Sequence, residues 1–153
     1  MRRMRILIIP GNDEAVMDNL VEFIKKNQTT LQAIKHRLFI IGVKNLVEHI
    51  GKKIPKKFLK ERIVVLYRIN KDKDLGSQVL KIFIDVNPDI ILFFKRRKID
   101  EDNCSMISFY HLATSRKGIK IISYIDSSNV SEYVRVGEHI QSPTDLIRIF
   151  EED

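Results

Sequence analysis

Five short runs of isoleucine, leucine, valine and phenylalanine recur along this sequence and leave few folds open to it. They occupy residues 4–9, 38–43, 63–69, 90–94 and 119–125. Most are continuously apolar rather than alternating, which is typical of strands buried on both faces. Such strands belong to parallel sheets that helices cover on both sides.

The segments between these runs carry the periodicity of helices. After Asn12, a possible cap, Val16, Leu20, Phe23 and Ile24 fall on one helical face. Further helices are predicted over residues 45–50 with a continuation over 56–61, from Asp72 or Asp74 to Asn87, from Ser105 to near Gly118, and after Ser142-Pro143-Thr144-Asp145, which has the form of a capping box.

Strands that alternate with helices imply right-handed crossovers between parallel strands. The sequence therefore predicts an α/β fold of the Rossmann-like type, a three-layer, doubly wound sandwich with a mostly parallel five-stranded sheet. The 153 residues suit a single domain, and no repeat or linker interrupts residues 1–153.

The distribution of apolar residues and cysteine predicts a cytoplasmic protein. No apolar run approaches the ~20 residues that span a bilayer, and the basic N-terminus leads into only five apolar residues before Gly11. The single cysteine, Cys104, has no intramolecular disulfide partner and no neighbours at metal-ligand spacing. We therefore expect no secretory signal, no membrane partner, no metal and no cofactor.

A net charge of +7 favours a polyanionic partner. Residues 52–62 carry six basic groups and one acid, so nucleic acid could contact Lys52, Lys53, Lys56, Lys57 and Lys60. The alternative is that Ile54, Phe58 and Leu59 anchor a helix whose lysines face water.

Ligands of open parallel sheets bind beyond the carboxyl ends of the strands. After the first predicted strand, Gly11 permits a tight turn and Asn12 precedes a helix whose free N–H groups could hold an anion, although acidic residues already follow. After the second, Gly42 permits close approach of a phosphate, Lys44 adds a positive charge and Asn45 begins a helix. Plain turns and caps are the alternative at both places.

Polar residues after the fourth and fifth predicted strands extend this set of candidate ligand contacts. Lys95 and Arg96 open a polar segment that is either a lid over a phosphate or a solvated loop. Ser105, at the start of the following helix, is a further candidate. Asp126 could contact a ribose, although such residues are often only part of turns.

Catalytic patterns are weak in this sequence. The four histidines, His36, His49, His111 and His139, form no metal or triad motif. Glu48 precedes His49, but neighbours in a helix point about 100° apart. A cysteine at a helix start, such as Cys104, can have a lowered pKa, although inert buried cysteines are more common.

The order of these segments resembles the YspA-like branch of the SLOG superfamily, over residues 4–125. The similar features are Arg5-Ile6-Leu7-Ile8-Ile9 followed by a glycine and a helix, the strand that ends in Gly42, Pro88-Asp89-Ile90-Ile91-Leu92-Phe93, and residues 113–118 leading into Ile119-Lys120-Ile121-Ile122. The resemblance implies a Rossmann-like domain that binds or processes nucleotide-derived molecules.

This sequence departs from that family's pattern at several positions. Glu48 lies near the place of the family's acid, but Leu46 stands where a second glycine is expected. Val79 and Leu80 replace an Arg-Asn pair, and residues 95–103 replace a glycine-rich loop. These departures favour a ligand-binding relative over an enzyme.

Three functions therefore remain open. The first is binding, by sensing or sequestration, of a nucleotide or nucleotide-derived molecule at the carboxyl rim of the sheet. The second is an N-glycosidic hydrolase or transferase that uses Glu48 or an acid among residues 100–102. The related nucleoside deoxyribosyltransferases carry a catalytic carboxylate in the helix after the fourth strand. Residues 105–113, at that place in this sequence, include no carboxylate. The third is a basic interaction module for nucleic acid or an acidic protein. A homodimer is also expected.

Overall fold

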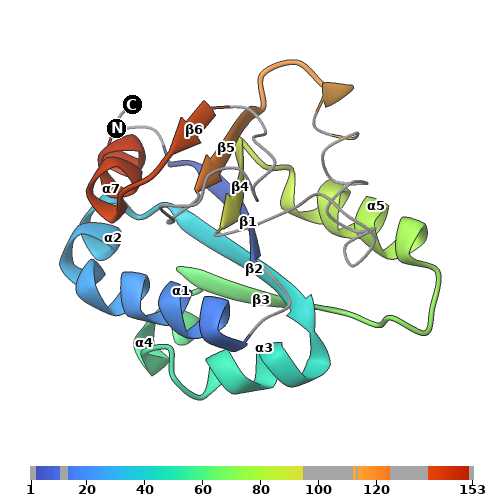
Figure 1. The fold of residues 1–153 in the computed structure, drawn as a ribbon, viewed down its shortest axis with the longest axis horizontal. Coiled ribbons are helices and arrows are strands. Elements are labelled where there is room, and N and C mark those ends of the chain that lie inside the picture. Colours follow the sequence, from blue (N-terminus) through green and yellow to red (C-terminus); the bar gives the residue numbers. More distant parts are fainter. Residues whose placement is uncertain (1–2, 11–13, 95–111, 113, 125–137, 152–153) are drawn as a thin grey trace.

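A single sheet of six parallel strands organises the protein (Figure 1). The computed structural model describes residues 3–10, 14–94, 112, 114–124 and 138–151. The strands are β1 (Arg5–Pro10), β2 (Arg37–Val43), β3 (Val64–Ile69), β4 (Ile90–Phe94), β5 (Lys120–Tyr124) and β6 (Glu138–Ile140). The predicted α/β class and parallel sheet are confirmed, with one more strand than the sequence indicated.

The strands lie in the order β3-β2-β1-β4-β5-β6, and every pairing is parallel. From β1 the chain therefore builds outwards through β2 and β3, then returns to the other side of β1 to place β4, β5 and β6. The order reverses between β1 and β4, which is the switch point of a doubly wound Rossmann-like sheet.

Helices cover both faces of the sheet, as the three-layer prediction requires (Figure 1). They are α1 (Glu14–Lys26), α2 (Gln28–Ile34), α3 (Lys44–Gly51), α4 (Lys56–Lys60), α5 (Leu75–Val86) and α7 (Pro143–Glu151). Ile6, Ile8 and Leu38 share a buried cluster with residues of α1, α2, α3, α4 and α7. Leu7, Ile9 and Phe39 point to the opposite face and pack against α5.

Local sequence chemistry explains where two of these helices begin. Asp74 accepts a hydrogen bond from the backbone N–H of Gly76 at 3.1 Å, and Ser142 Oγ accepts one from Asp145 at 3.1 Å. Both side chains satisfy N–H groups that have no partner within the helix. The predicted starts of α5 and α7 are thereby confirmed.

Two short elements were not predicted. Helix α2 begins with Gln28-Thr29-Thr30 and lacks a side-chain cap, so its buried Leu31 and Ile34 give little periodicity to recognise. Strand β6 has three residues, of which Ile140 is buried. Both owe their structure to tertiary packing rather than to a local pattern.

The described helices include none with the length and hydrophobicity needed to cross a membrane.

Candidate functional site

The carboxyl ends of the central strands gather at one edge of the sheet. Pro10 of β1 pairs with Phe94 of β4, and Val43 of β2 pairs with Ile69 of β3. Parallel pairing directs the connections that leave these strands towards the same edge. Of the predicted ligand contacts beyond this edge, Gly11, Asn12, Lys95, Arg96, Ser105 and Asp126 lie outside the described residues.

A cleft of about 800 Å³ lies at this edge, where β2 and β3 end. We call it the rim cleft; it is lined by Val43, Lys44, Asn45, Arg68, Ile69, Asn70, Lys71, Asp72 and Gln78. Its charged side chains are three cations and one carboxylate, so the cleft has a net positive charge. Lys44 and Asn45 had been predicted from the sequence as ligand contacts, whereas Arg68 and Lys71 had not.

One wall of the rim cleft is held by the side chain of Gln78 on α5. Its Oε1 accepts a hydrogen bond from the backbone N–H of Asn70 at 2.7 Å, and its Nε2 donates to the Asn70 carbonyl at 2.8 Å. The Asn70 side chain in turn accepts from the N–H of Asp72 at 2.9 Å. The connection between β3 and α5 is therefore ordered by hydrogen bonds that the sequence pattern did not reveal.

The facing wall is the first turn of α3. Val43 occupies its N-cap position, so no side chain caps the helix there. Lys44 and Asn45 are exposed in this turn. The uncapped N–H groups and the positive end of the helix dipole favour an anion, and the Lys44 ammonium adds to that attraction.

Gly42 is explained by packing. A Cβ built at this position would lie 2.8 Å from Met17 Cε and 3.3 Å from Val47 Cγ2. The residue is buried, and it is not part of the lining of the rim cleft. The absence of a side chain therefore lets α1 and α3 approach β2, and this accounts for the glycine without a phosphate.

Glu48 lies one helical turn beyond Lys44 and faces the cleft residue Arg68. Its Oε1 is 4.0 Å from Arg68 Nη1, and both side chains are more than half exposed. An ion pair of this kind contributes little to stability. Glu48 thus partly offsets the positive charge that Arg68 brings to the rim cleft.

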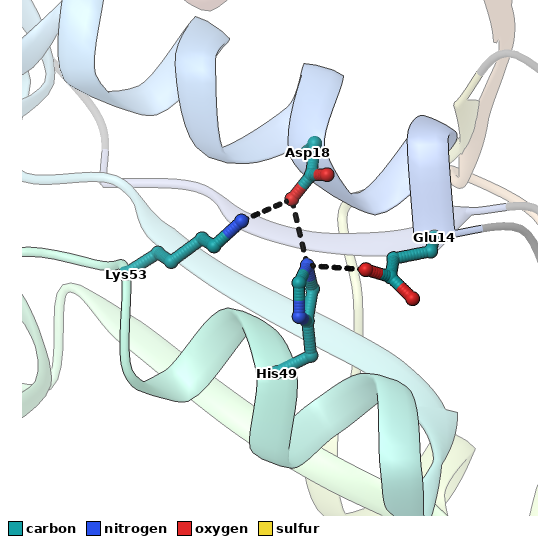
Figure 2. A network of polar contacts seen from close by, with 4 residues as sticks. All are labelled: Glu14, Asp18, His49 and Lys53. Atoms are coloured by element: carbon teal, nitrogen blue, oxygen red, sulfur yellow. Dashed lines mark hydrogen bonds and ion pairs between the residues drawn. The ribbon is translucent and has the colours of Figure 1, made fainter.

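A second polar network joins α1 to α3 (Figure 2). His49 Nε2 lies 2.7 Å from Asp18 Oδ1 and 3.7 Å from Glu14 Oε1. Lys53 Nζ donates to the same Asp18 oxygen at 2.8 Å. The hydrogen bond from Lys53, followed by that from His49, lowers the pKa of Asp18.

This network positions α3 relative to α1. One ligand atom from each of Glu14, Asp18 and His49 lies within 4.8 Å of the others, which is a spacing that could hold a metal ion. The Asp18 oxygen, however, already accepts a hydrogen bond from the Lys53 ammonium, so this ligand atom is engaged within the protein. As expected for neighbours in a helix, Glu48 and His49 point to different partners, Arg68 and Asp18.

Among the remaining histidine and cysteine candidates, His36 has a structural role. His36 is buried; its Nδ1 accepts a hydrogen bond from the Met4 N–H at 3.0 Å, and its Nε2 lies 2.8 Å from the Phe150 carbonyl. It therefore ties the start of the chain to α7. Cys104 and His111 lie outside the described residues.

The basic segment 52–62 is partly engaged within the protein. Lys53 contacts Asp18, and Lys57 Nζ donates to Gln32 Oε1 at 2.8 Å. Lys52, Lys56 and Lys60 are exposed. Ile54 and Phe58 are buried, so their predicted role as anchors is confirmed.

No protein-family model matches the sequence, and no curated protein matches it either. The resemblance to the SLOG superfamily therefore stays a prediction.

Proposed function

We propose that the chain binds a nucleotide or nucleotide-derived molecule in the rim cleft, as a sensor or sequestering domain. The observation that carries this proposal is the convergence of Lys44, Arg68 and Lys71 on one cleft at the carboxyl edge of a doubly wound sheet. Ligands of such sheets bind at this edge. Three cations beside one carboxylate favour the phosphate end of such a ligand.

The chemistry of the rim cleft suits the separate parts of a nucleotide. The first turn of α3 and the Lys44 ammonium would hold a phosphate. The Arg68 guanidinium can donate two parallel hydrogen bonds to a second phosphate. Amide groups of Asn45 and carboxylate oxygens of Asp72 offer the polar contacts that a base or a ribose needs.

The rim cleft lies one strand away from the switch point between β1 and β4. A ligand of nucleotide size that starts in the cleft would extend towards the connections after these strands. We expect Gly11, Asn12, Lys95, Arg96, Ser105 and Asp126 to complete the site from there. A homodimer and a cytoplasmic location are further parts of this proposal.

The test is a thermal shift assay with nucleoside mono-, di- and triphosphates, cyclic nucleotides and ADP-ribose. A ligand that binds only the folded state raises the melting temperature, by an amount that grows with the ratio of its concentration to Kd. We expect the shift to be lost in Lys44→Ala and Lys71→Ala. The matched control is Lys81→Ala, which removes an exposed lysine of α5 away from the cleft.

Two outcomes would overturn the proposal. One is the absence of any shift across the panel at millimolar concentration. The other is a shift of the same size in the two cleft variants and in wild type.

A further inference from the structure

A second hollow, of about 660 Å³, lies at the amino ends of β1, β2 and β3, opposite the rim cleft. We call it the amino-edge hollow. It is lined by the cations Arg3, Lys35, Arg37 and Arg62, together with Glu61 and Gln32. Segments far apart in the sequence thus bring four positive charges and one negative charge to a single concave surface.

These cations are not neutralised by the part of the chain that the structure describes. No carboxylate among the described residues lies within 4.0 Å of Arg3, Lys35, Arg37 or Arg62. The pKa of Arg37 is lowered by burial and then by the neighbouring charges of Arg5 and Arg62. Mutual repulsion of this kind is relieved when an anion enters the hollow.

Arg37 is held in place before any ligand arrives. Its Nε donates to the backbone carbonyl of Arg62 at 3.2 Å, and its guanidinium carbon lies 5.3 Å from the centre of the Phe39 ring. The guanidinium of Arg5 lies 5.1 Å from the same ring. A fixed guanidinium loses less conformational freedom when it binds an anion than a free side chain does.

The backbone at two of the cations adopts a conformation that L-amino acids avoid. Lys35 has φ of 58° and Arg62 has φ of 60°, both in the left-handed region. Arg62 follows the end of α4, where Ile63 N–H donates to the Phe58 carbonyl and Arg62 N–H donates to the Leu59 carbonyl. Glycine is the usual residue at this position of a helix end, so a residue with a side chain costs backbone energy there, whatever its charge.

We propose that the amino-edge hollow binds a phosphate-bearing polyanion with two or more phosphate groups. Arginine is the residue best suited to such a ligand, because its planar donors match phosphate oxygens. The hollow has room for more than one phosphate, and the Lys57–Gln32 hydrogen bond joins it to the lysines of α4. This site shares no residue with the rim cleft, so the proposal does not depend on the proposed function.

The test measures binding of two probes at low ionic strength, inorganic tripolyphosphate by calorimetry and a short single-stranded RNA by fluorescence anisotropy. Lys35→Gly and Arg62→Gly each remove a charge and, at the same time, the energetic cost of a positive φ. We expect each to weaken binding by about tenfold or more, while the melting temperature stays equal to that of wild type or rises.

Asn87→Gly is the matched control. Asn87 has φ of 47° at the end of α5 and does not line the amino-edge hollow. The substitution makes the same change of backbone and should leave binding unchanged. Lys44→Ala should also leave it unchanged, which separates this site from the rim cleft.

The two probes distinguish the sources of the phosphates. If the ligand is a nucleic acid, RNA should bind more tightly than tripolyphosphate. The salt dependence of RNA binding should then fall by about one released counterion in each variant. A small polyphosphate predicts tighter binding of tripolyphosphate. The proposal is overturned if neither probe binds wild type. It is also overturned if Lys35→Gly, Arg62→Gly and Arg37→Gln all bind the probes as wild type does. In that case the cations only stabilise the negative, carbonyl ends of the dipoles of α2 and α4.

Discussion

Replacing Gly42 by alanine tests why a glycine stands next to the last residue of β2, the strand that leads to the rim cleft. The new methyl group would lie 2.8 Å from Met17 Cε and 3.3 Å from Val47 Cγ2. Met17 is fully buried, so its terminal methyl has little room to move, and Val47 is branched at Cβ. Overpacking of a core costs about 1–3 kcal/mol, and because the nearest atom is the end of a flexible side chain we expect about 1–2 kcal/mol.

Equilibrium unfolding in urea measures this cost, and a double-mutant cycle identifies its origin. Met17→Leu removes the terminal methyl and should by itself cost less than about 1.5 kcal/mol. In that background Gly42→Ala should be less destabilising by about 0.5 kcal/mol or more, because the shorter contact is gone. An equal cost in both backgrounds would refute the packing explanation. Unchanged stability with lost nucleotide binding would instead restore the predicted role of Gly42 at a phosphate.

Three further outcomes follow from contacts in the structure. The pKa of Asp18 is lowered from its ordinary value of 3.8, so the stability gained from the Lys53 hydrogen bond should be present above that pH and lost as the pH falls through the lowered pKa. Asp18→Asn should therefore flatten the pH dependence of the urea midpoint in this acidic range. Ser142→Ala should cost about 1 kcal/mol in urea unfolding because α7 loses its cap, with Ser142→Thr as the conservative control. Wild type should release no free base from nucleoside monophosphates, as a binding protein; a release that Glu48→Gln abolishes would support the N-glycosidic alternative.

The fold could be predicted where burial leaves a local pattern. The central strands are continuously apolar because helices cover both faces, and polar caps such as Asp74 mark the starts of helices. Helix α2 and strand β6 escaped prediction because neither is long enough to show a period. The strand order also depends on long-range pairing, which no local pattern records.

The candidate site could be predicted only in part. Lys44 and Asn45 follow a buried strand directly, so the rule that ligands bind beyond carboxyl ends was enough to select them. Arg68 and Lys71 lie beside Lys44 and Asn45 because β3 pairs with β2. Gln78 of α5 holds the backbone of Asn70 by a hydrogen bond. Such relations depend on tertiary structure, as does the meeting of cations at the amino-edge hollow.

The chemical meaning of a residue type was also ambiguous in the sequence. A glycine near the end of a strand fits close approach to a phosphate and tight packing of helices equally well. The positions of Met17 and Val47, which the sequence could not show, give a packing reason for Gly42. Similarly, the lysines of residues 52–62 formed one basic run, but the fold gives Lys53 and Lys57 partners inside the protein.

Chemical shift mapping of the amide groups tests most directly whether a phosphate-bearing ligand occupies the rim cleft. Titration of ¹⁵N-labelled protein with ADP-ribose and with nucleoside triphosphates should move the amide signals of Lys44, Asn45, Asn70 and Lys71, because these groups line the cleft. Shifts confined to other parts of the chain, or no shift with any of these ligands at millimolar concentration, would contradict the assignment of the cleft as the binding site.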